Sequence, residues 1–295
     1  MKHEISQFEN LDLSLADQFE NSENLLIHGK DFKVVDIIPK QIKSEIPTIM
    51  VPGFSATPEA LKDAILRTAE AGRRVISAYA PHGVEYPLSE QAGKSNKKSD
   101  LPEMHERKLQ LLLKLIEAKN LGPVNIIANS EAASIVTAAA YLYPEKFRNI
   151  VLVEPAGLIG EDNFFSLVIR FLKDMKEEKA QAKHFKRAEF PSPASVGIKS
   201  VLSDIPGSAR EVQAIAKSDI TKFLEEIHKS GVGISIIHGV DDKLFPMDKV
   251  QKMTKEKMID GFYSVKGSHN MIYSYEPFGR LAETALTDLE KKSKK

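Results

Sequence analysis

Short apolar runs alternate along the chain with longer segments of helical periodicity. Val124–Ile127, which is apolar apart from Asn125, and Ile150–Val153 have a length and composition typical of buried strands. Between them, residues 131–142 have the composition of a buried helix, which Tyr143-Pro144 ends. A strand, a helix and a second strand at this spacing predict two parallel strands joined by a right-handed crossover.

The same alternation continues on both sides of this unit. Strands are expected at residues 48–51, 75–80, 233–238 and 262–265, a hairpin at 25–38, and helices at 58–71, 100–121, 164–179 and 276–291. Thr57 is expected to cap the helix that Pro58 opens, and Asp100 and Glu103 to form a capping box. The chain is therefore predicted to be an α/β protein with a mostly parallel central sheet flanked by helices.

Residues 158–208 interrupt this alternation. A charged amphipathic helix begins at Phe164, and Pro191, Pro193 and Pro206 punctuate the segment that follows. We predict a helical cap at 158–208, inserted into a core formed by 1–157 and 209–295. The alternative is a pair of ordinary crossover helices.

Composition narrows the class of protein. The 295 residues contain 41 Lys and Arg against 41 Asp and Glu, and this balance disfavours a nucleic-acid partner bound through bulk charge. The absence of cysteine excludes disulfides and thiolate metal ligands. The first residues lack an apolar signal core, and no apolar run approaches the roughly 18 residues of a membrane span. We expect a cytoplasmic protein without a membrane span, cofactor or metal, and its oligomeric state stays open.

Ser130 is the strongest candidate for chemistry. It closely follows the predicted strand Val124–Ile127 and precedes the helix. A serine on a sharp strand-to-helix turn exposes its hydroxyl, and the residues two before and two after it must be small. Both are alanine here, Ala128 and Ala132, where glycine is more usual. The alternative is a serine that only caps the helix.

Three further motifs lie in a consistent order around Ser130. Val51-Pro52-Gly53-Phe54 ends a strand upstream; Gly239, Asp242 and Pro246 mark a turn after a later strand; and Gly267-Ser268-His269-Asn270 precedes the last helix. From about Leu25 to Leu289 the chain resembles the α/β-hydrolase fold superfamily, in which the order is serine, acid, histidine.

The resemblance implies a role for each matching residue. Ser130 would be the nucleophile, His269 the base and Asp242 the acid that orients it, with Asp241 or Glu154 as alternative acids. The backbone N–H groups of Phe54 and Glu131 would form the oxyanion hole.

Other polar and motif-like residues have simpler interpretations. Many relatives have histidine at the position of Pro52, and proline, which has no side-chain donor and no backbone N–H, cannot support that loop in the same way. We expect the Glu131 side chain to favour the positive end of its helix, His238 to be a core histidine and His82 a loop residue. Residues 92–95 resemble the end of a phosphate-binding loop, but Leu88 replaces its first glycine.

The expected function is hydrolysis of a carboxylic ester or related acyl compound, a small molecule, through an acyl-enzyme. Amide, lactone, thioester or carbon–carbon bond hydrolysis by the same residues stays open. The alternative from another class is a non-catalytic protein of this fold that binds a ligand or partner.

Overall fold

The computed structural model describes residues 14–27, 30–78, 101–181, 201–270 and 276–293. Eight strands form one sheet in the order β1-β2-β4-β3-β5-β6-β7-β8. The strands are β1 Glu23–Ile27, β2 Lys30–Ile37, β3 Ser44–Val51, β4 Arg73–Ala78, β5 Val124–Asn129, β6 Phe147–Val153, β7 Gly233–Gly239 and β8 Gly261–Val265. β2 is antiparallel to both of its neighbours, and the strands from β4 to β8 are parallel.

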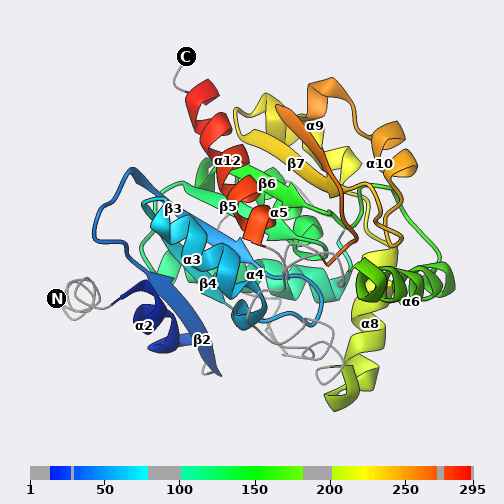
Figure 1. Ribbon diagram of the computed structural model, residues 1–295, viewed down its shortest axis with the longest axis horizontal. Helices are drawn as coiled ribbons and strands as arrows, with labels where there is room; N and C mark the ends of the chain where they lie inside the picture. Colours follow the sequence, from blue (N-terminus) through cyan, green and yellow to red (C-terminus); the bar gives the residue numbers. More distant parts are fainter. Residues whose placement is uncertain (1–13, 28–29, 79–100, 182–200, 271–275, 294–295) are drawn as a thin grey trace.

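Helices cover both faces of the sheet (Figure 1). One face carries α4 Glu103–Ala118, α5 Ala132–Leu142 and α9 Thr221–Lys229, and the other carries α2 Leu15–Glu20, α3 Lys62–Glu70 and α12 Glu276–Ser293. The remaining α-helices that the structure describes are α6 Phe164–Gln181, α8 Ile205–Ala216 and α10 Met247–Met253. The predicted fold class, a mostly parallel sheet between helices, is confirmed.

The apolar runs of the central strands follow from this layering. Side chains alternate between the two faces of a strand. In β5, Ile126 packs with the α4, α5 and α9 side, and Ile127 packs with the α3 and α12 side. A strand covered by helices on both faces has no polar face, so it reads as a continuous apolar run.

Several local expectations need correction. The Thr57 side chain makes no capping hydrogen bond, and the segment begins as a 3-10 turn over Pro58–Leu61 before α3. The N-cap of α4 is Pro102, so Glu103 is the first residue of the helix and not the third, as the predicted capping box requires. Asp100, the other predicted member of that box, lies outside the described residues.

Some expectations fall on other parts of the chain. His82 and residues 88–95 lie outside the described residues. The predicted cap boundary at residue 208 lies within α8, which continues to Ala216. Among the helices of the described ranges, none has the length and apolar character needed to cross a membrane.

Candidate active site

Ser130 lies on a sharp turn between β5 and α5. Its φ is 51°, in the left-handed region that non-glycine residues rarely adopt. Main-chain hydrogen bonds hold the turn: Ser130 N donates to Val153 O at 2.9 Å, and Ser130 O accepts from Ala133 N and Ala156 N. Ala128 and Ala132 are fully buried, so the crowding that requires small flanking residues is present.

The structure brings Ser130, His269 and Asp242 together. His269 Nε2 lies 2.8 Å from Ser130 Oγ, and His269 Nδ1 lies 2.9 Å from Asp242 Oδ2. The other carboxylate oxygen, Asp242 Oδ1, accepts hydrogen bonds from the main-chain N–H groups of Leu244 and Phe245 at 2.7 and 2.8 Å. With both oxygens engaged, the Asp242 carboxylate has a fixed orientation toward the imidazole.

The alternative acids occupy different positions. Asp241 is partly exposed, and its main-chain N donates to Gly267 O. Glu154 follows β6 with a φ of 48°, and its carboxylate lies against Gly239, beneath the turn that carries Asp242. Asp242 is the one of the three whose carboxylate lies at hydrogen-bonding distance from Nδ1 of His269.

His238 is a core histidine, as its place in an apolar strand suggests. It is fully buried in β7, and its Nε2 donates to Phe245 O at 2.8 Å. Burial lowers the pKa of His238 below its usual value, because desolvation disfavours the imidazolium.

The loop after β3 approaches the Ser130 turn closely. A Cβ atom on Gly53 would lie 2.9 Å from Asn129 Oδ1 and 3.0 Å from Ser130 Cβ. Glycine at this position therefore allows the Phe54 main chain to lie beside the serine. On the other side, the Glu131 N–H makes no main-chain hydrogen bond within the described part of the chain. The two predicted oxyanion donors thus belong to segments that meet at Ser130.

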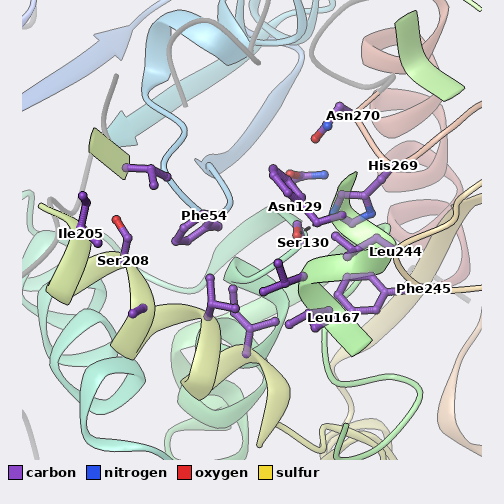
Figure 2. Close-up of a pocket in the computed structure, with 16 residues that line it drawn as sticks. Phe54, Asn129, Ser130, Leu167, Ile205, Ser208, Leu244, Phe245, His269 and Asn270 are labelled. Carbon is purple, nitrogen blue, oxygen red and sulfur yellow. Dashed lines mark hydrogen bonds between the residues drawn. The ribbon is translucent and has the colours of Figure 1, made fainter. Parts of the chain in front are cut away.

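A cavity of about 280 Å³ opens onto Ser130 and His269 (Figure 2). Its polar lining residues are Asn129, Ser130, Ser208, His269 and Asn270. The rest of its described lining is apolar: Phe54, Leu167, Val168, Phe171, Val201, Ile205, Ala209, Val212, Ile215, Leu244 and Phe245. α6 and α8 supply much of this apolar wall, which lies over the carboxyl ends of the strands, where open α/β sheets bind ligands.

The α6 helix contacts the loops that carry Asp242 and His269. Arg170 Nε donates to Leu244 O at 2.9 Å. Asp174 Oδ1 accepts from Lys243 N at 2.9 Å and from His269 N at 3.4 Å. Asp174 is fully buried, and burial raises its pKa to about 6, an effect to which the nearby Asp242 adds and which His269 opposes.

A second group of buried charges lies beside the Ser130 turn. Glu131 Oε1 lies 3.1 Å from His105 Nε2, and Glu131 Oε2 lies 2.8 Å from Lys108 Nζ, both on α4. Lys108 also pairs with Glu211 of α8. Burial alone would raise the pKa of Glu131, but Lys108 and His105 together lower it to about 2.

The sequence pattern does not predict these contacts. His105 and Lys108 are three residues apart, a spacing that places them on one face of a helix, and Glu211 lies three residues from both Ser208 and Ala214 in α8. This spacing identifies neither their burial nor their partners, because the partners are more than 20 residues away along the chain. The same holds for Asp174.

Comparisons with known proteins agree with the architecture. No protein family model matches the chain. A protein of Mycobacterium phage D29, named as a non-heme haloperoxidase, is 24% identical over 265 residues, which cover 82% of this chain and 88% of that protein.

Solved structures are similar over most of the chain. The enol-lactonase of Burkholderia xenovorans LB400 superimposes with a TM-score of 0.61 at 16% identity, covering 91% of this chain and all of that one, 100%. A carboxylesterase of Nitrososphaera gargenis gives a TM-score of 0.59 at 16% identity, with 92% and 99% covered. The chain therefore has the α/β-hydrolase fold.

Proposed function

We propose that the protein is a serine hydrolase that cleaves a carboxylic ester or related acyl compound through an acyl-enzyme. The observation that carries this proposal is the continuous hydrogen-bonded series from Asp242 through His269 to Ser130, with spacings of 2.9 and 2.8 Å. A serine hydroxyl is a weak nucleophile unless an adjacent base removes its proton, and this series supplies such a base.

Each group has a role in the proposed reaction. Ser130 Oγ attacks the acyl carbon while His269 Nε2 takes the hydroxyl proton, and His269 then returns that proton to the departing alcohol. Asp242 Oδ2 accepts from Nδ1–H and stabilises the imidazolium. The N–H groups of Phe54 and Glu131 bind the oxyanion. Water then releases the acid by the same steps.

The apolar wall supports an uncharged, apolar acyl or alcohol group as the preferred substrate. The side chains that line the cavity within the described ranges include no lysine, arginine, aspartate or glutamate. A substrate carboxylate or ammonium placed against this wall would lose its hydration without gaining an ion pair, which is costly.

Labelling with a fluorophosphonate tests the proposal directly. The wild type should be labelled covalently, and Ser130→Ala should not be labelled. Ser134→Ala is a matched control, since Ser134 is buried in α5 four residues further on and its hydroxyl lies 3.4 Å from Ala156 O. An unlabelled wild type would instead favour the non-catalytic ligand-binding alternative. If the wild type is labelled, a panel of esters, thioesters, lactones and amides identifies the bond that it cleaves.

A further inference from the structure

The charged group beside Ser130 connects the proposed oxyanion donor to the wall of the cavity. The group consists of His105 and Lys108 of α4, Glu131 after Ser130, and Glu211 of α8, and we call it the charge cluster. Its side chains are almost completely buried, with exposures of 0%, 10%, 1% and 0% in that order. Buried charges are retained only where they are paired, so each contact in the cluster constrains the helices that carry it.

His105 links Glu131 to the end of α8. Its Nε2 faces the Glu131 carboxylate, which only accepts, so Nε2 is the donor of that hydrogen bond. Its Nδ1 lies 3.2 Å from Ser218 Oγ, which also lies 2.8 Å from Ala214 O. His105 therefore contacts both the residue after Ser130 and a residue just beyond α8.

Two carboxylates of the cluster, Glu131 and Glu211, share one ammonium group. Lys108 is central, because its Nζ contacts both carboxylates. Its loss would remove an ion pair from each of them.

The helix that carries Glu211 has two distinct faces. Ile205, Ala209, Val212 and Ile215 of α8 line the cavity, at the spacing of one helical stripe. Glu211 lies on the adjacent stripe and reaches Lys108 of α4, and Ser218, just beyond the helix, reaches His105. The cluster therefore joins α8 to α4 at two points and joins α4 to Glu131.

We propose that Lys108 and His105 are positioning residues: through Glu131 they fix the backbone N–H that binds the oxyanion, and through Glu211 and Ser218 they fix α8 as the cavity wall. This inference rests on the proposed function. A displacement of a preorganised donor by a fraction of an ångström weakens transition-state binding more than ground-state binding. Disturbing Lys108 should therefore affect kcat more than KM.

Lys108→Met, Lys108→Arg and Lys114→Met test the proposal on a short-chain ester. Lys114 is the matched control, since it lies on α4 but pairs with the exposed Glu117. We expect Lys108→Met to lower kcat roughly 10- to 100-fold while KM changes less than about 3-fold. Lys108→Arg should recover most of the loss, and Lys114→Met should stay within about 2-fold of the wild type. An unchanged kcat in Lys108→Met, or no recovery with arginine, would overturn the proposal.

The connection to the cavity wall has its own measurement. Glu211→Gln should lower the ratio of kcat/KM for an octanoate ester to that for a butyrate ester by roughly 5-fold, because α8 forms part of the cavity wall and a longer chain would contact more of that wall. An unchanged ratio would contradict the role assigned to α8.

Two further measurements keep the test decisive. If Lys108→Met does not fold, Glu131→Gln, which keeps the shape and removes the charge, should still lose kcat, and full activity there would contradict the proposal. Fluorophosphonate labelling of Ser130 separates failure of this proposal from failure of the proposed function. If the wild type is labelled and kcat is unchanged in Lys108→Met, the positioning role is wrong while the hydrolase function stands; if the wild type is not labelled, the hydrolase function itself is wrong.

Discussion

Two buried carboxylates near the Ser130 turn have opposite electrostatic surroundings. Glu131, 1% exposed, contacts Lys108 and His105, and its pKa falls to about 2. Asp174, 0% exposed, accepts two main-chain hydrogen bonds, lies near another carboxylate, Asp242, and its pKa rises to about 6. Burial raises the pKa of both carboxylates, but only Glu131 has cationic partners strong enough to outweigh it. The oxyanion side is held by paired charges, and the histidine side mainly by main-chain donors.

The largest expected effect tests the histidine side. Asp242→Asn should lower kcat about 10³- to 10⁴-fold, because an amide cannot hold the imidazole in the required tautomer and stabilise its charge. Asp241→Asn, one residue earlier and partly exposed, should cost less than about 10-fold. Steady-state kinetics on one ester compares the two, and a larger loss at Asp241 would show that the acid was assigned to the wrong residue.

Stability against pH tests the contrast between the two carboxylates. The pKa of Asp174 is about 6 in the folded protein, against an ordinary value of 3.8 for an exposed aspartate. As pH rises from about 4 to 6, the unfolded chain loses this proton first, so ionisation destabilises the fold. The free energy of unfolding of Asp174→Asn should therefore rise by about 2–3 kcal/mol relative to that of the wild type between pH 4 and pH 7. Urea unfolding at a series of pH values measures this difference.

Glu131→Gln should behave in the opposite way. The lowered pKa of Glu131 means that its charge stabilises the fold above about pH 4.5, and this contribution is lost as pH falls toward 2. The free energy of unfolding of the wild type should thus exceed that of Glu131→Gln near neutral pH, and this difference should shrink as pH falls. If the stabilities of Asp174→Asn and Glu131→Gln relative to the wild type changed with pH in the same direction, the opposite pKa shifts of Asp174 and Glu131 would be contradicted.

Gly53→Ala tests the close approach on the oxyanion side. The added Cβ would lie within 3.0 Å of Asn129 and Ser130, so the Phe54 main chain must move away from the serine. We expect kcat to fall roughly 10- to 100-fold with a smaller change in KM. Gly122→Ala is the control, because a Cβ there meets nothing within 4 Å. Equal kinetics for both variants would show that the approach is not needed.

The smallest expected effect concerns the cavity wall. Phe171 of α6 lines the cavity, whereas Phe165 of the same helix is 72% exposed and is absent from its lining. Phe171→Ala should change the ranking of esters of different chain length by roughly 5-fold, and Phe165→Ala should leave it unchanged. Fluorophosphonate labelling of Ser130 should remain in both. A ranking that stays the same in Phe171→Ala would place the specificity elsewhere.

The sequence predicted those features that depend on residues close together along the chain. The apolar run before Ser130, the small flanking alanines and the order of Asp242 and His269 are short-range signals, and they predicted the sheet and the site residues that lie together. The Pro102 cap and the charge cluster were not predictable in the same way. A buried lysine such as Lys108 looks like any helical lysine until the helix that carries Glu211 is placed beside it.

The contacts of α6 bear on how this protein could be rebuilt by exchange of segments. Arg170 and Asp174 bond to the main chain of Leu244, Lys243 and His269, within the two loops that hold Asp242 and His269. A helix taken from another protein of this fold, chosen only to reshape the cavity, would remove these hydrogen bonds. Such a chimera would have a reshaped cavity but a less firmly held His269 loop, unless the donor helix carried a hydrogen-bond acceptor at the position of Asp174.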